Sequence, residues 1–492
     1  MRPFLFSFSL TILALVSALA LPLTLAGCGG EEPRPELVAR AVLPADTIEP
    51  GPPVGRELAP VINGRRMPMD GFPVQGFSAV LPGANGELLV LQDNGFGSRA
   101  NSPAFPLHWF RLGVDWGAEK GQPGKVELRE VVRLTDPSHL IPGTPPDGLL
   151  TGAHLDPESF VRAPDGTIWV GEEFGPFLVH FSADGQVLET PIPLPLPADM
   201  APYGRNLTTL MSPDHPELRH QADGPQLANL PRSGGVEGLA LAGDGKTLYV
   251  AIEKGLVEDP DRRRRILLEF DLDSGTFADR FHRYEVDAAD VSIAALESAG
   301  PGRLLLTERD RKEGEAAIIK RVYRVDLGTR DERGCLQKHL VCDLLNMADP
   351  RGLTRAESGA VGLGADFQFP FVTPECLMLL DPRTLLLIND TAGHSAGGGR
   401  NTRRLLHRAG RHRPGPRPHP GQPSLPRVGP AADPGRPRLG RDLLDGAPLS
   451  PSSGLGLPGV RVRRHGRQRP AVAAFPGEHR AGAPPDPGFS GR

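Results

Sequence analysis

The chain has 492 residues and a net charge of −4, so it is long enough for two or three domains, although one large β architecture can absorb well over ~300 residues. Aromatic residues make up only 5% of the chain, while 60 glycines and 54 prolines favour many turns and short elements. This composition argues against a protein built from long helices.

The N-terminus resembles the leader of a bacterial lipoprotein. Arg2 supplies a positive charge, residues 4–25 are apolar, and the tetrapeptide Leu25-Ala26-Gly27-Cys28 follows at once. In such leaders the peptidase cleaves before the cysteine, whose thiol carries diacylglycerol. We therefore predict a leader over residues 1–27, lipidation of Cys28, and export to the bacterial cell envelope, with a lipid anchor in the cell membrane or the outer membrane as the contact with the membrane.

Two other interpretations of the leader are weaker. An ordinary secretion signal would end in an Ala-x-Ala site instead of a cysteine directly after the apolar run. A membrane span needs about 20 apolar residues with flanking charges, and Pro22 argues against one. Residues 28–65 are rich in Pro, Glu and Gly, and we expect them to tether the following domain.

Three further cysteines follow Cys28: Cys335, Cys342 and Cys376. An exported chain meets an oxidising compartment, where Cys335 and Cys342 can close a small loop. Buried free thiols are an equal alternative, because one of the three must stay unpaired in any case.

Short β-rich runs begin near residue 70 and are separated by Asp-Gly, Asn-Gly and Ser-Gly turns, which is typical of antiparallel sheets. Five segments repeat one plan, in which a polar residue begins an apolar strand and an acidic residue ends a second strand about 15 positions later. They read GFSAVLPGANGELLVLQDNG, ESFVRAPDGTIWVGEEFG, VEGLALAGDGKTLYVAIEKG, VSIAALESAGPGRLLLTERD and PECLMLLDPRTLLLINDTAG. We predict an all-β fold, a β-propeller of six or seven blades over residues 66–391.

Each repeat places two polar residues at the same end of a hairpin, because the start of the first strand lies beside the end of the second. In a propeller these pairs surround one central mouth. The expected pairs are Ser78 with Asp93, Glu158 with Glu172 or Glu173, Glu237 with Glu253, Ser292 with Glu308, and Glu375 with Asp390.

Carboxylates that converge on one mouth repel each other, so they require a cation or strong hydrogen-bond donors. Calcium accepts about six to eight oxygen ligands in loose geometry, and no His-rich spacing speaks for zinc. Some of these acids have a structural alternative, namely capping a turn or pairing with a neighbour such as Lys254 or Arg309. The predicted calcium ligands are Asp93, Glu173, Glu237, Glu253 and Asp390.

These residues also resemble the phytase-like domain of the esterase-like phytase family, over roughly residues 65–391. The resemblance rests on the order and spacing of Gly76-Phe77-Ser78, Asp93 to Gly97, Asp156 to Phe160, Glu173 to Pro176, Gly235 to Ala240, Thr307 to Asp310 and Leu387 to Asp390. It implies an exported bacterial propeller, grouped with calcium-dependent β-propeller phytases and lactonase-type esterases. It transfers no set of catalytic residues.

The composition changes after Asp390. The family motif normally continues with another asparagine and a last strand, whereas here Thr391-Ala392-Gly393-His394 follow, and from residue 393 on the chain has no Lys, Ile, Tyr or Trp. An Arg- and Pro-rich tail is either an arm for nucleic acid or anionic surfaces, or an out-of-frame translation of GC-rich coding sequence. We favour the second interpretation for residues 392–492, so we expect no nucleic-acid partner and a missing closing strand.

The tail also contains a match to the Gly-x-Ser-x-Gly nucleophile elbow, at Gly393-His394-Ser395-Ala396-Gly397. That elbow needs a strand, a sharp turn and a helix within an alternating α/β fold. The preceding chain has no such alternation, so we interpret the match as chance.

The sequence therefore favours a monomeric hydrolase that cleaves a small phosphoester or carboxylic ester with the help of calcium. Glu158 or Glu308 would deprotonate the attacking water. Arg99, Lys254 and Arg309 would pair with substrate oxygens. A lactonase-type esterase would combine the same ring with an apolar pocket, and a non-catalytic surface propeller that binds a ligand or partner is the alternative from another class.

Overall fold

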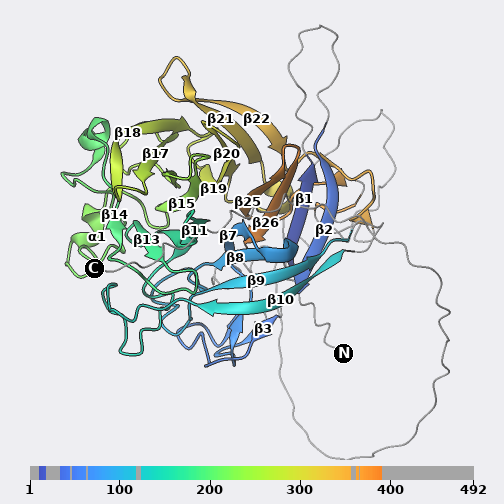
Figure 1. Cartoon of the computed structure of the whole chain (residues 1–492), viewed down its shortest axis with the longest axis horizontal. Coiled ribbons are helices and arrows are strands. Elements are labelled where there is room, and N and C mark those ends of the chain that lie inside the picture. Colours follow the sequence, from blue (N-terminus) through green and yellow to red (C-terminus); the bar gives the residue numbers. More distant parts are fainter. Residues whose placement is uncertain are drawn as a thin grey trace, which may run out of the picture. The chain divides into compact units, whose positions relative to one another are not determined.

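The computed structural model describes residues 10–17, 34–44, 47–62, 65–117, 123–355, 362–364 and 366–390, all within one of two compact units, Met1–Arg413. Nearly every regular element in these ranges is a strand (Figure 1). The expected all-β class is confirmed. No helix in the described ranges has the length and apolar character that a membrane span requires.

Three sheets are antiparallel meanders of four consecutive strands, which we name blades 2, 3 and 4. Blade 2 consists of β11 (Pro157–Arg162), β12 (Ile168–Glu172), β13 (Phe177–Phe181) and β14 (Ile192–Pro193). Blade 3 consists of β15 (Val236–Leu241), β16 (Thr247–Ile252), β17 (Arg264–Asp271) and β18 (Thr276–Glu285). Blade 4 consists of β19 (Ser292–Ser298), β20 (Arg303–Arg309), β21 (Lys320–Arg330) and β22 (Leu336–Asp343).

A larger sheet contains two more blades, because a short parallel pairing of β10 with β2 joins their outer strands. Blade 1 consists of β7 (Phe77–Pro82), β8 (Leu88–Gln92), β9 (His108–Asp115) and β10 (Gly124–Arg133). Blade 5 consists of β25 (Thr373–Asp381), β26 (Thr384–Asp390), β1 (Leu10–Ser17) and β2 (Glu36–Pro44). The short strands β23 (Met347–Ala348) and β24 (Asp366–Phe367) extend it beyond β2.

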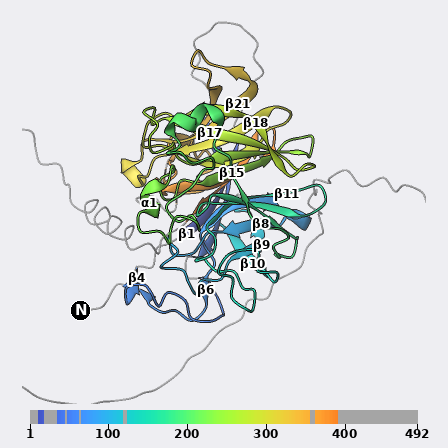
Figure 2. The same ribbon diagram turned by 90° about the vertical axis from the view of Figure 1, so that its left-hand side faces the viewer.

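The remaining elements are short. β3 (Ile48–Glu49) pairs with β6 (Phe72–Pro73), and β4 (Val61–Ile62) pairs with β5 (Arg65–Arg66), in the segment that precedes blade 1 and projects beyond it (Figure 2). The described helical turns are α1 (Gly224–Leu227) and the 3-10 turns Ala84–Gly86, Ala198–Tyr203 and Gly314–Ala316.

The first strands of the blades close a ring. β7 contacts β11, β11 contacts β15, β15 contacts β19, β19 contacts β25, and β25 returns to β7 (Figure 1). The described residues thus form a propeller of five blades, and the expected six or seven is wrong. The wide spacing of the repeats reflects two outer strands and long connections, such as residues 194–235, instead of hidden blades.

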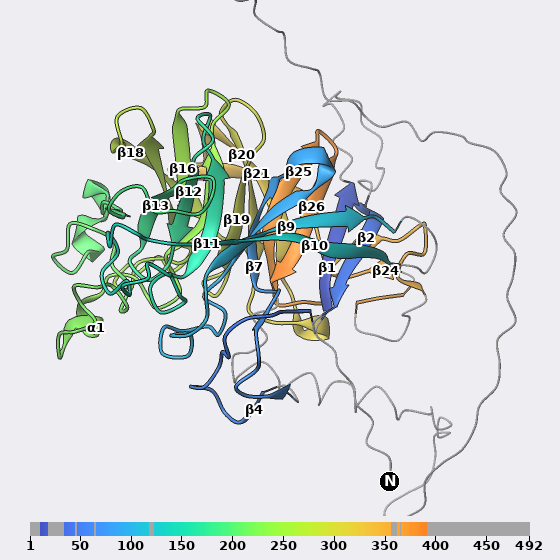
Figure 3. The same ribbon diagram turned by 60° about the horizontal axis from the view of Figure 1, so that its bottom comes forward.

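Blade 5 is completed from the N-terminal side. β1 lies between β26 and β2 and is antiparallel to both (Figure 3). β1 falls inside the predicted leader, and β2 falls inside the expected tether of residues 28–65. That part of the tether is therefore a strand, and its alternating residues Leu37, Ala39, Ala41 and Leu43 are buried.

Several predictions concern residues outside the described ranges. They are the cleavage site and lipidation of Cys28, the nature of residues 392–492, and the elbow match at Ser395. Cys335, Cys342 and Cys376 are described, and all three are buried free thiols, so the disulfide alternative is wrong.

Candidate functional site

Each inner strand contains a β-bulge at the same place. The pairing of the first two strands skips one residue per blade, and such an extra residue re-aims its side chain out of the regular pleat. The skipped residues are Ser78, Glu158, Glu237, Ala294 and Glu375.

A second residue of each blade lies at the end of the second strand, beside the bulge. In blades 1 to 3 its backbone N–H donates to the carbonyl two residues before the bulge, at 2.9, 3.0 and 2.9 Å, and in blades 4 and 5 the same two residues are ladder partners. These second residues are Asp93, Glu173, Glu253, Arg309 and Asp390. We name the ten residues of both sets the polar ring.

Side chains from different blades meet in the polar ring around Arg309. Its Nη2 lies 3.1 Å from Oε1 of Glu375, 3.4 Å from Oε1 of Glu253 and 3.5 Å from Oε1 of Glu237. Burial acts to lower the pKa of Arg309, but these carboxylates outweigh it and raise that pKa. The guanidinium of Arg309 is therefore a permanent positive charge in the ring.

Glu253 differs from the other acids of the ring. Burial acts to raise its pKa, but the charges of Lys254 and Arg309 outweigh burial, and the pKa lies below its usual value. Nζ of Lys254 is 2.7 Å from Oε2 of Glu253. Glu253 is thus the carboxylate that the protein's own cations already compensate.

The other carboxylates lack comparable compensation. Burial, followed by repulsion from neighbouring carboxylates, raises their pKa values well above normal. This group comprises Asp93, Glu158, Glu173, Glu237 and Glu375. Burial also raises the pKa of Asp156, two residues before the bulge of blade 2, to about 6.

Two overlapping triads have the spacing of a cation site. Asp156, Glu158 and Glu173 form one, Glu173, Glu237 and Glu253 form the other, and the oxygens in each lie within 4.8 Å of one another. Glu173 belongs to both, and its Oε1 accepts a hydrogen bond of 3.2 Å from the Gly235 N–H. An all-oxygen donor set fits a hard cation such as calcium.

An orphaned hydroxyl supports a ligand in the ring. Oγ of Ser78 is buried, with 2% of the residue exposed, and it has no hydrogen-bond partner among the described residues. Buried polar atoms normally have a hydrogen-bond partner, so the Ser78 hydroxyl is available to a ligand in the ring.

The predicted ligands divide between two parts of the ring. Glu173, Glu237 and Glu253 belong to the triads, whereas Asp93 and Asp390 occupy ring positions outside both triads. Glu158, expected as a catalytic base, lies in the ring and stays partly exposed.

Arg99 lies outside the ring. Its guanidinium is 4.7 Å from the centre of the Phe174 ring and donates to the carbonyl of His154 at 3.3 Å. Burial, together with Arg219, lowers its pKa to about 10, and Asp156 is among the anions that act against this shift. Arg99 thus lies within the electrostatic reach of Asp156, and its role in binding a substrate stays a prediction.

The prediction for blade 4 is wrong. Glu308 is fully buried between blades 3 and 4, where it accepts hydrogen bonds from the Tyr284 hydroxyl at 2.5 Å and from Nζ of Lys338 at 2.6 Å. Neighbouring residues of a strand point to opposite faces, so Arg309 faces the ring and Glu308 faces away. Ala294, not Ser292, is the bulged residue.

Blade 2 obeys the same rule. Glu172 accepts hydrogen bonds from the N–H groups of Phe174 at 2.8 Å and Gly175 at 2.7 Å, so it shapes the following turn, and Glu173 is the ring residue. Asp156 was missed because in the other blades this position holds glycine, serine or threonine.

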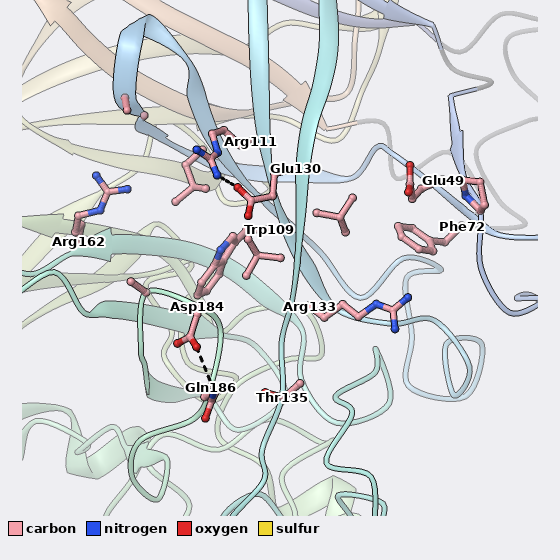
Figure 4. A pocket seen from close by; sticks show the side chains of 17 residues that line it. Glu49, Phe72, Trp109, Arg111, Glu130, Arg133, Thr135, Arg162, Asp184 and Gln186 are labelled. Atoms are coloured by element: carbon pink, nitrogen blue, oxygen red, sulfur yellow. Dashed lines mark hydrogen bonds and ion pairs between the residues drawn. The ribbon is translucent and has the colours of Figure 1, made fainter.

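A cavity of about 970 Å³ lies elsewhere, along the outer strands of blades 1 and 2 (Figure 4). Among its lining residues, Arg111 pairs with Glu130, and Asp184 accepts from Gln186 at 3.1 Å. Because Arg111 and Glu130 compensate each other and the Asp184 carboxylate is hydrogen-bonded by Gln186, the cavity is a weaker candidate than the polar ring, whose carboxylates are under-compensated.

Comparisons with known proteins show which family the sequence around the polar ring matches. The sequence matches the family Phytase-like, described as esterase-like activity of phytase, over residues 72–391. An uncharacterized secreted protein of Arthroderma benhamiae is 33% identical over 195 residues, which are 35% of this chain and 37% of that protein. The chain thus spans little more than a third of the length of this relative.

Solved structures show only distant similarity. The hydrazine synthase of Kuenenia stuttgartiensis matches 67% of this chain and 99% of its own, with 11% identity and a TM-score of 0.32. Virginiamycin B lyase of Staphylococcus aureus matches 63% of this chain and 65% of its own, with 11% identity and a TM-score of 0.24. Since the family match covers more than half of the sequence and includes every residue of the polar ring, the chain belongs to the Phytase-like family, described as esterase-like activity of phytase.

Proposed function

We propose that the protein is an exported, calcium-dependent hydrolase of small phosphoesters or carboxylic esters, with the polar ring as its active site. The observation that carries the proposal is the convergence of carboxylates from blades 2, 3 and 5 around Arg309 and Lys254, with most of their pKa values raised. Perturbed carboxylates of this kind cluster at functional sites. Family membership supports ester chemistry in particular.

The triad residues that would hold the cation are Asp156, Glu173, Glu237 and Glu253. Glu173 is central because both triads contain it. When bound, calcium would supply Lewis-acid polarisation of a substrate oxygen and a lower pKa for water. Its charge would also relieve the repulsion that raises the pKa values of the ring carboxylates.

Glu158 is the proposed general base. It is the triad residue that stays partly exposed, so a substrate that enters the mouth reaches it first. Burial and repulsion from neighbouring carboxylates raise its pKa, and a carboxylate with a raised pKa is a stronger base toward water. Arg99 and Lys254 are the proposed partners of the substrate's anionic oxygens.

The proposed setting is the bacterial cell envelope, with a lipid on Cys28 and a monomeric domain. The apolar leader before Leu25-Ala26-Gly27-Cys28 supports export, and so does the secreted relative. Lipid labelling with a radioactive or alkyne fatty acid, abolished in Cys28→Ala, tests the anchor.

Hydrolysis of p-nitrophenyl phosphate and p-nitrophenyl acetate tests the activity. We expect turnover of at least one of them, its loss after chelation with EGTA, and its return when calcium is added. Turnover that survives complete chelation would refute the role of calcium. Calcium that raises thermal stability without any turnover, on these esters or on a lactone, would favour the non-catalytic binding propeller.

Two substitutions separate the roles of the carboxylates. Glu173→Gln is expected to abolish calcium binding and turnover, whereas Glu158→Gln should lower kcat by about 10²- to 10⁴-fold. Glu189→Gln is the matched control, since Glu189 pairs with His180 on the outer part of blade 2. Equal activity in all three variants would contradict the assignment.

A further inference from the structure

Blade 4 breaks the pattern of the polar ring. The other four blades each contribute at least one carboxylate, whereas blade 4 contributes Ala294 and Arg309. At the end of the second strand, blades 1, 2, 3 and 5 have Asp or Glu, whereas blade 4 has the permanent cation Arg309. This substitution changes the ring by two charges and places the positive charge on one side.

The contacts of Arg309 resemble those of a bound cation. One nitrogen faces carboxylate oxygens of Glu237, Glu253 and Glu375 at 3.1 to 3.5 Å. Calcium would contact such oxygens at about 2.3 to 2.6 Å, so the guanidinium compensates the same charges in a looser arrangement. Its buried Nε has no hydrogen-bond partner among the described residues, so the side chain is held mainly by charge.

The residues beside Arg309 anchor its backbone. Glu308 is fixed by Lys338 and Tyr284 in the layer between blades 3 and 4. On the other side, the fully buried Lys320 donates to the carboxylate of Asp310 at 2.8 Å and to the carbonyl of Val372 at 2.7 Å. Arg309 therefore cannot leave the ring without breaking buried ion pairs. In this respect it differs from a bound metal ion, which can exchange with the solvent.

The position of Arg309 favours one of the two triads. Its guanidinium already contacts Glu237 and Glu253 of the second triad, whereas the first triad belongs to blade 2 and shares with the second only Glu173. Arg309 pairs with Glu375 at 3.1 Å, and Asp390 adds to the field that raises the pKa of the guanidinium. A second cation on the blade 5 side would meet the charge of Arg309 within a few ångströms.

We propose that Arg309 is a built-in cation that takes the place of one metal ion in the polar ring, confines calcium to the side of Glu173, and so sets the number of ions bound. This inference rests on the proposed function in that it assumes calcium as the mobile ion. It assigns Arg309 a role other than binding substrate, and it makes Glu375 and Asp390 partners of Arg309 instead of calcium ligands.

Counting bound calcium by equilibrium dialysis and isothermal titration calorimetry tests this inference. Compared with the wild-type chain, Arg309→Gln is expected to bind one additional equivalent, and Arg309→Lys, which keeps the charge, should bind the wild-type number. The matched control is Arg321→Gln, because Arg321 belongs to the same blade and pairs with Asp287 and Asp343 outside the ring. It should also bind the wild-type number.

The outcomes distinguish this inference from the proposed function. A folded Arg309→Gln variant with unchanged stoichiometry overturns the inference, whatever the wild-type chain binds. If the wild-type chain binds no calcium and Arg309→Gln binds one equivalent, the metal-dependent function fails but Arg309 is the stand-in cation. If Arg309→Gln folds only in the presence of calcium, the inference is supported, and if it folds in neither condition, the inference is overturned.

Discussion

The role of a residue in this protein depends on a shift of one position along a strand. Glu308 and Arg309 are adjacent, yet one is buried between two blades and the other lies in the polar ring. The same holds for Glu172 and Glu173. In both pairs the side chains point to opposite faces of one strand, and the bulge determines which of them meets the other blades.

Lys338→Met is expected to destabilise the protein strongly. Lys338 provides the positive charge beside the fully buried Glu308, and its loss leaves that carboxylate without a cation. Breaking one partner of a buried pair typically costs about 3 to 5 kcal/mol of unfolding free energy. Denaturant unfolding of the single variant measures this loss.

A second variant separates the charge from the packing of Lys338. The double variant Glu308→Gln/Lys338→Met should recover much of the lost stability, because the uncompensated charge is gone. Glu308→Gln alone should keep kcat near that of the wild type, since Glu308 lies outside the ring. A large fall in kcat with normal stability would return Glu308 to the catalytic site.

At the scale of elements, the blades are held together by polar contacts as well as by the apolar core between them. Glu297 on β19 of blade 4 accepts the N–H of Leu379 on β25 of blade 5 at 3.1 Å. Burial raises the pKa of Glu297 to about 7. This contact therefore couples the stability of the interface to pH.

The expected pH dependence follows from the sign of this shift. The pKa of Glu297 in the folded protein exceeds that of an unfolded glutamate, about 4.3, so its contribution is fully present below pH ~4 and is lost as the pH rises toward about 7. Glu297→Gln is expected to lose less stability over this range. At pH 8 it should exceed the wild type by about 1 to 3 kcal/mol.

Thermal unfolding of both proteins at pH 5 and pH 8, with saturating calcium so that the ring carboxylates stay ionised, measures the difference. The Gln oxygen still accepts the Leu379 N–H, so a change at pH 5 should be small. If the difference in stability between the wild type and Glu297→Gln is the same at pH 5 and pH 8, Glu297 does not titrate as expected.

At the scale of the whole molecule, the closure of blade 5 is unlike that of the other blades. In blades 1 to 4 the third strand follows the second directly along the chain, whereas the third strand of blade 5 is β1, at residues 10–17. Chain order assigns this place to the segment after Asp390. β1 also lies in the predicted leader, so processing at Cys28 would remove it and expose β26 and β2 as open edges.

A chain that begins at Cys28 is therefore expected to unfold at a lower temperature than an unprocessed chain with Cys28→Ala. Scanning calorimetry of the two purified proteins measures the difference. Equal unfolding temperatures would mean that another segment fills the place of β1.

Resequencing the gene across the codons for residues 385–400 decides which segment that is. A missing or extra base there would replace the Arg- and Pro-rich tail with an in-frame strand after Asp390. An intact frame would contradict our interpretation of residues 392–492 and would restore the arm and the Ser395 elbow as hypotheses.

The amino-acid sequence by itself determined the fold class, the five inner hairpins and three of the five pairs of ring residues, and it left Glu172 and Glu173 as alternatives in a fourth pair, because alternation and turn residues are local signals. The spacing of 15 residues that separates Ser78 from Asp93 also separates Ala294 from Arg309, although in blade 3 the spacing is 16. Only the tertiary structure decided the number of blades, the inclusion of β1 and β2, the orientation of Glu308 and the pairing of Arg309 with three acids. These depend on contacts between blades, which bring together residues far apart in the chain and leave no periodic trace within any one segment.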